Sequence, residues 1–95
     1  MKAYKKIFTA LSAKGVIDVY MYIYYRYTTG KYPSFDDIRV ALKMAKGTLR
    51  RITNRLSRCD MISSIHPENE QDGRKRVYIV ENEGLAEILR QVYTL

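Results

Sequence analysis

Positive charge is concentrated in one stretch of the sequence, with a spacing that suits contact with a polyanion. Between Arg39 and Arg58 there are seven Lys or Arg residues and no Asp or Glu, so this stretch accounts for the whole formal net charge of +7. Within it, Leu49, Ile52 and Leu56 fall at i, i+3 and i+7, which on a helix defines one apolar stripe. The cations lie off that stripe, and a helix that is apolar on one side and cationic on the other suits the major groove of DNA.

A run of charge is more often only a solvated helix face. Solvated helices usually mix signs, because like charges three or four residues apart repel each other. The like pairs in this stretch are Lys46 with Arg50, Arg51 with Arg55, and Arg55 with Arg58. Repulsion of this kind favours a nucleic-acid contact over a solvated face.

The residues before the basic helix predict a second helix that braces it. Ser34, with Asp37 three residues on, resembles a capping box at the start of a helix that should run to about Lys43. Positions 44–45 leave only a tight turn before the basic helix opens. The spacing therefore predicts a helix-turn-helix over about 34–58, with the basic helix at 46–58.

The segment 16–27 fits two patterns. Its tyrosines alternate between positions 20 and 24 as in a strand. One helical stripe also fits, with Ile17, Tyr20, Tyr24 and Tyr27. We predict a helix. An amphipathic helix is also predicted over 3–11, before this segment.

The residues after the basic helix predict a β-hairpin and a closing helix. Asp60 is expected to take the left-handed conformation that ends a helix. A short strand at 63–66, a polar loop and a β-rich run to Val80 predict a hairpin over about 63–80. The final amphipathic pattern predicts a helix over about 83–94.

The order of these elements and three strings resemble winged helix-turn-helix regulators of the ArsR and MarR types, including archaeal ones. The strings are ALSAKGVIDVY at 10–20, KGTLRRITNRL at 46–56 and DGRKRVYIV at 72–80. The resemblance implies one domain over 1–95 with an α+β, mostly helical fold, a two-stranded wing and amphipathic terminal helices. It further implies a homodimer that binds double-stranded DNA in a sequence-specific way and regulates transcription. The basic, tyrosine-rich composition gives an impression of a protein from archaea or their viruses.

The same resemblance assigns DNA contacts by position. The helix 46–58 would enter the major groove, and the wing at 67–76 would lie near the minor groove. Arg can present two donors to guanine O6 and N7, and Asn can bridge N6 and N7 of adenine. The expected base contacts are Thr48, Arg50, Arg51 and Asn54. The expected phosphate contacts are Arg39, Lys43, Lys46, Arg55 and Arg58, and the expected wing contacts are Arg74, Lys75 and Arg76. For Asn54 the alternative is a solvent-facing amide.

The two terminal helices are the expected dimer interface, because their apolar sides have no other obvious surface to cover. The expected interface residues are Tyr4, Ile7, Phe8, Leu11, Leu85, Ile88, Leu89 and Val92.

Several other functions are not supported by residue types. Metal-sensing ArsR proteins carry paired cysteines in the helix before the recognition helix, where this chain has FDDIR, and His66 is its one histidine. The adjacent Asp36 and Asp37 fit a helix start better than a metal site. Neither a phosphate loop nor a catalytic pair is visible, so no enzyme, cofactor or metal is expected. Oxidation of Cys59 could alter DNA binding, but its place three residues after Leu56 favours a buried apolar role.

The location and the mode of binding complete the expectations. No signal peptide is visible, and the most apolar run, 16–25, contains Asp18 and is too short to span a bilayer. We therefore expect a cytoplasmic, nucleoid-associated protein with no membrane partner. The alternative to a sequence-specific regulator is a non-specific architectural DNA-binding module, or one that binds a protein or RNA. Phosphate contacts serve both, so the charge does not decide between them.

Overall fold

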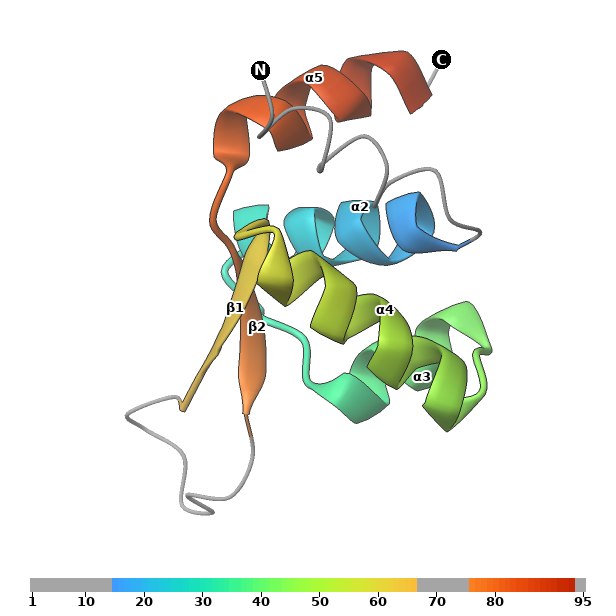
Figure 1. Ribbon diagram of the computed structural model, residues 1–95. Helices are drawn as coiled ribbons and strands as arrows, with labels where there is room; N and C mark the ends of the chain where they lie inside the picture. The colour runs from blue at the N-terminus through green and yellow to red at the C-terminus, as the bar shows by residue number, and fades with distance from the viewer. Residues whose placement is uncertain (1–14, 67–75, 94–95) are drawn as a thin grey trace.

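Four helices and two strands make up the part of the chain that the computed structural model describes, residues 15–66 and 76–93 (Figure 1). The helices are α2 (Val16–Thr28), α3 (Phe35–Leu42), α4 (Lys46–Arg58) and α5 (Glu83–Tyr93). The strands are β1 (Ile62–Ile65) and β2 (Val77–Val80). The helix expected over 3–11 lies outside the described residues.

Helix α2 is the centre of the core. It packs against β2, α5, α3 and α4, and in Figure 1 it lies between α5 and the α3–α4 pair. Its buried residues, Val16, Val19, Tyr20 and Ile23, have the spacing of one helical face. The helix predicted over 16–27 is confirmed and the strand alternative is wrong. As a helix, this segment can pack against four other elements at once.

The start of α3 is fixed by local hydrogen bonds. The Ser34 hydroxyl accepts a hydrogen bond from the Asp37 backbone N–H at 3.2 Å, and the Asp37 carboxylate accepts one from the Ser34 N–H at 3.0 Å. The predicted capping box is therefore confirmed. The helix ends at Leu42 and is capped by Lys43, whose φ of 54° is left-handed, and α4 begins three residues after this cap.

A Schellman motif ends α4. Asp60 has a left-handed φ of 57°, as expected, and its N–H donates to the Ser57 carbonyl at 3.1 Å. The Met61 N–H donates to the Leu56 carbonyl at 3.0 Å. Leu56 and Met61 are both fully buried members of the core, as suits the apolar positions of this motif.

The strands β1 and β2 pair antiparallel, with a register from Ile62 opposite Val80 to Ile65 opposite Val77. The other edge of β2 meets the chain just before α3: Ser34 bridges Val77, and the Tyr78 N–H donates to the Pro33 carbonyl at 2.9 Å. The strand expected at 63–66 begins and ends one residue earlier, because Ile62 is buried and pairs directly after the Schellman turn.

Helix α5 is held on α2 by tyrosine hydroxyls. Tyr20 donates a hydrogen bond to the Asn82 carbonyl at 2.8 Å. Tyr24 donates to Glu87 at 2.7 Å, and Tyr27 donates to Glu83 at 2.8 Å. The two carboxylates are one turn apart on α5, so the two bonds fix the register between the helices.

We expect a Glu87→Gln variant to lose less stability in acid than the wild type. Hydrogen bonds from Arg90 and then Tyr24 lower the pKa of Glu87 from 4.5 to about 2. A carboxyl whose pKa is lowered by folding stabilises the fold above pH 4.5, and this contribution disappears as the pH falls toward 2. The melting temperature of the wild type, followed by circular dichroism, should therefore fall more steeply in this range than that of Glu87→Gln.

The Tyr24→Phe variant is the control for this experiment. It removes the tyrosine hydrogen bond, which lowers the pKa of Glu87 less than Arg90 does, and leaves Arg90 beside Glu87. The melting temperature of Tyr24→Phe should therefore fall with pH more steeply than that of Glu87→Gln and less steeply than that of the wild type. If the melting temperatures of the wild type and Glu87→Gln fall equally steeply with pH, Glu87 is not the source of the acid-dependent stability.

Candidate nucleic-acid interface

One side of α4 is buried in the core. Leu49, Ile52 and Leu56 are buried, which confirms the stripe predicted from the sequence. Thr53 is also buried, and the sequence reasoning did not identify it. Its hydroxyl donates a hydrogen bond to the Arg50 carbonyl, 3.1 Å away, so burial leaves no polar group unsatisfied.

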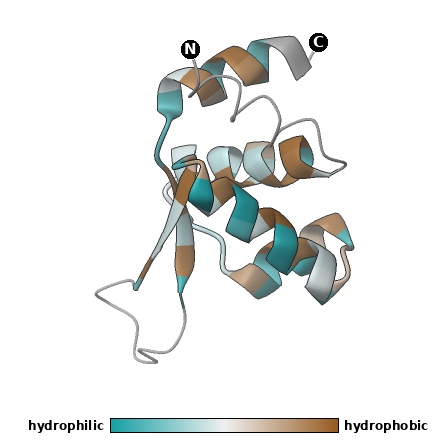
Figure 2. Ribbon diagram, viewed as in Figure 1, coloured by the Kyte–Doolittle hydropathy of each residue, from teal (hydrophilic) through white to brown (hydrophobic). Residues whose placement is uncertain are grey.

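The other side of α4 is exposed and cationic. Figure 2 shows strongly hydrophilic sections along this helix. The exposed residues are Lys46, Gly47, Arg50, Arg51, Asn54, Arg55, Ser57 and Arg58, and Thr48 is half-buried. The residues expected to contact bases and phosphates from α4 therefore lie on one helix, and all except Thr48 are exposed to solvent.

The arginines of α4 differ from the other described arginines in their partners. Outside α4, each described arginine has a partner within the chain. Arg26 donates to the Tyr22 hydroxyl, Arg39 lies near Asp36, Arg76 donates to Ser64, and Arg90 donates to Glu87. In the described part of the chain, no hydrogen bond or ion pair involves the guanidinium groups of Arg50, Arg51, Arg55 or Arg58. The cations of α4 are thus available to an external anion.

Arg50 makes a contact of a different kind. Its Cζ atom lies over the ring of Phe35, 4.4 Å from the ring centre. This distance is within the range of a cation–π interaction. Phe35 is the first residue of α3, so the contact joins the two helices of the helix-turn-helix. The sequence did not indicate this contact, because no local signal links residues that are so far apart in the chain.

Of the two cations expected to contact phosphates from α3 and its turn, Arg39 already has an acidic neighbour. Arg39 Nε lies 3.6 Å from the Asp36 carboxylate; the Asp36 side chain is largely exposed and the Arg39 side chain is 42% exposed. The pair has i, i+3 spacing, which was visible in the sequence. An exposed pair of this kind is weak, so Arg39 can exchange Asp36 for a phosphate at little cost. Lys43 is exposed at the turn that leads into α4.

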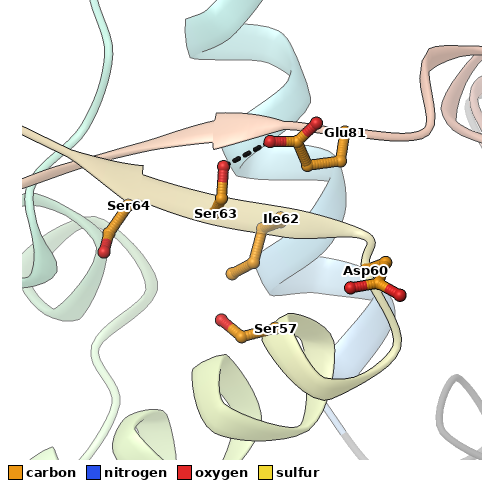
Figure 3. A pocket seen from close by; sticks show the side chains of 6 residues that line it. All are labelled: Ser57, Asp60, Ile62, Ser63, Ser64 and Glu81. Carbon is orange, nitrogen blue, oxygen red and sulfur yellow. Dashed lines mark hydrogen bonds between the residues drawn. The ribbon is translucent and has the colours of Figure 1, made fainter.

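An open groove lies beside the end of α4. Its lining residues are Ser57, Asp60, Ile62, Ser63, Ser64 and Glu81 (Figure 3). The Ser63 hydroxyl donates a hydrogen bond to Glu81. Three serines, from α4 and β1, and two acids line this space. Asp60 and Glu81 would repel phosphate. The cationic surface of α4 therefore ends at this groove.

The base of the wing carries one described cation. Arg76 is exposed just before β2, and it donates a hydrogen bond to the Ser64 hydroxyl of β1 at 3.3 Å. Arg74 and Lys75, the other expected wing contacts, lie outside the described residues.

The fold occurs in solved structures of low sequence identity. Reduced HlyU from Vibrio cholerae matches with a TM-score of 0.76 at 10% identity, over 99% of this chain and 92% of its own. MepR from S. aureus, in a crystal structure of its complex with DNA, matches with a TM-score of 0.70 at 20% identity, over 98% of this chain and 70% of its own. A protein from Archaeoglobus fulgidus matches with a TM-score of 0.66 at 19% identity, over 88% of this chain and 87% of its own.

The fold is a winged helix-turn-helix. No protein-family model and no curated protein matches the sequence. In this winged helix, α3 and α4 form the helix-turn-helix and β1 with β2 forms the wing. The α+β, mostly helical fold that the sequence predicted is thus confirmed.

The residues expected at a dimer interface have different positions in the winged helix. Ile88 is 61% exposed, Leu85 is half-buried and Leu89 is buried in the core of the chain itself. The premise that α5 has no other apolar surface to cover is therefore wrong for Leu89, because α5 packs on α2. Tyr4, Ile7, Phe8 and Leu11 lie outside the described residues, as does the side chain of Val92.

Three other features of the winged helix bear on function. Cys59 is a free cysteine, partly buried against the core at the end of α4. No helix among the described residues is long and apolar enough to cross a membrane. In the same part of the chain, no three His, Cys, Asp or Glu side chains form a group that could hold a metal ion.

Proposed function

We propose that the protein is a sequence-specific regulator of transcription that binds double-stranded DNA as a homodimer. One observation carries the proposal. Within the described residues, the four α4 arginines have no hydrogen-bond or ion-pair partner, whereas each of the other described arginines has one. Four neighbouring like charges repel each other, and a polyanion would compensate them. The winged fold and the complex of MepR with DNA support this choice of polyanion.

The proposal places α4 in the major groove. Arg50, Arg51 and Asn54, with Thr48, would contact base edges, where Arg and Asn make bidentate contacts to guanine and adenine. Lys46, Arg55 and Arg58 would contact phosphates, together with Arg39 and Lys43 from the preceding helix and its turn. The wing, with Arg74, Lys75 and Arg76, would lie near the minor groove. A protein of this kind would be cytoplasmic and associated with the nucleoid.

Fluorescence anisotropy tests the proposal. The protein is titrated with a pool of random duplexes and with duplexes selected from that pool for tight binding, each over a series of salt concentrations. We expect a steep salt dependence for both and a preference of about a hundredfold or more for the selected duplexes. A steep dependence without preference would mean an architectural DNA-binding module. The absence of duplex binding at moderate salt would favour a protein or RNA partner.

The proposed dimer uses the exposed side of α5. Ile88 is an apolar side chain that is exposed in the described part of the chain, and Tyr25 of α2 is similarly exposed at 64%. A small domain often gains buried apolar surface by pairing with a second copy. A second copy would also present a second α4, which allows the protein to contact two half-sites of a near-palindromic operator.

We expect an Ile88→Asp variant to sediment as a monomer, because a carboxylate buried between two protomers would be unpaired. The matched control is Val40→Asp, which makes the same kind of change at an exposed apolar residue of α3, 69% exposed and away from α5. Sedimentation velocity should show a dimer for the wild type and for Val40→Asp. An unchanged dimer mass for Ile88→Asp would remove this residue from the interface.

A further inference from the structure

We propose that Phe35 is a positioning residue for Arg50 and makes Arg50 the main guanine-reading side chain of α4. The inference rests on the proposed function and deepens it, since it places a determinant of base specificity outside the recognition helix. The observation that points to it is the 4.4 Å separation between Arg50 Cζ and the centre of the Phe35 ring.

The contact restrains Arg50 without using its hydrogen-bond donors. A guanidinium group carries five N–H donors in one plane, and a phenyl ring offers no lone pair to accept them. Within the described part of the chain, no hydrogen bond or ion pair occupies these donors. Arg50 is thus restrained and at the same time has a free fork of donors, which is what a bidentate contact to guanine O6 and N7 requires.

Phe35 is itself held firmly. It follows Ser34, whose side chain closes the capping box with Asp37 and whose backbone bridges Val77 of β2. The Phe35 ring is partly buried and packs against the core. The ring is therefore fixed from the helix side and from the sheet side, so it can serve as a rigid support for a long side chain.

The other α4 arginines have no comparable support among the described residues. Arg51, Arg55 and Arg58 are exposed, and the two cation–π contacts of the described chain involve Arg26 and Arg50. A long side chain that is free in solution loses conformational entropy when it binds, and a side chain that is already restrained loses less. Arg50 should therefore discriminate between bases more strongly than its neighbours.

A double-mutant cycle on base discrimination tests the inference. The proteins are the wild type, Phe35→Leu, Arg50→Gln and the double variant, with Phe35→Tyr as the conservative variant that keeps an aromatic ring. Each is titrated with the tightest duplex selected by the wild type and with its single base-pair changes. Melting temperatures confirm that each variant is folded, and a salt series counts its phosphate contacts.

We expect Arg50→Gln to lose discrimination at one G·C pair, and Phe35→Leu to lower it at that same pair about two- to fivefold, as suits an exposed cation–π contact. Phe35→Tyr should retain it, and Phe35→Leu should add nothing in the Arg50→Gln protein. The salt slope of Phe35→Leu should equal that of the wild type, because no phosphate contact is lost.

Other results would overturn the inference. If Phe35→Leu weakens binding to all duplexes equally, Phe35 has a structural role only. If it sharpens discrimination, the ring holds Arg50 away from the bases. A wild type without any base preference would overturn the proposed function as well, so the two failures are distinguishable.

Discussion

A variant with Lys46, Arg55 and Arg58 all replaced by Gln should bind duplex DNA two to three orders of magnitude more weakly than the wild type at 0.1 M salt. Each phosphate contact gives a slope of about −0.9 in log K against log salt. Three lost contacts therefore correspond to about 2.7 decades between 1 M and 0.1 M salt. Anisotropy titrations over a salt series measure both the affinity and the slope, which should become shallower by about 2.7.

The stability of this variant separates binding from folding. The three side chains are exposed and have no hydrogen-bond or ion-pair partners in the described chain, and Arg55 and Arg58 are a like-charged pair. Their removal should leave the melting temperature unchanged or slightly higher. The matched single variants are Arg55→Gln and Lys31→Gln, since Lys31 is an exposed cation in the loop before α3. Only Arg55→Gln should make the slope shallower, and a triple variant with an unchanged slope would exclude α4 as the phosphate-binding surface.

A Leu49→Ala variant should lose about 2 to 5 kcal/mol of unfolding free energy, because it removes a large buried side chain and leaves a cavity. Leu49 is fully buried and belongs to the stripe that anchors α4 in the core. The total free energy of unfolding of a small domain is about 5 to 15 kcal/mol, so the loss is a large part of its stability. Urea unfolding followed by circular dichroism measures the change.

Val40→Ala is the control for this variant, because Val40 is 69% exposed on α3 and its truncation should cost less than about 0.5 kcal/mol. At a temperature where Leu49→Ala is still folded, its affinity for DNA should equal that of the wild type. A loss of less than about 1 kcal/mol for Leu49→Ala would mean that α4 is not anchored through this residue.

The parts of the fold that depend on local signals could be predicted from the sequence. The stripe of α4, the capping box of Ser34 and Asp37, and the left-handed Asp60 all arise from residues within a few positions of one another. Helix α2 had an ambiguous pattern, and its contacts with several elements decide in favour of a helix. The strand β1 was displaced by one residue, because the Schellman turn sets where the extended chain begins.

The parts that depend on distant residues could not be predicted. The bond from Tyr24 to Glu87 joins residues 63 positions apart, and nothing near either residue indicates the other. The contact between Phe35 and Arg50 has the same character. For Leu89, the sequence showed an apolar position and not what covers it, and the core of the same chain covers it. Periodicity identifies which side of a helix is apolar, but not which element packs against that side.

The bridge between Ser34 and Val77 has a consequence for the proposed binding of DNA. Ser34 caps α3 and also pairs with the inner strand of the wing, so the wing and the helix-turn-helix are joined without a hinge at this point. A wing that cannot swing freely keeps a constant offset from α4. If α4 and the wing bind neighbouring grooves, the spacing of these grooves, which depends on the helical twist of the duplex, must match that offset. Under- or overwound DNA would then fit less well, and the degree of supercoiling would adjust how tightly the protein holds its site.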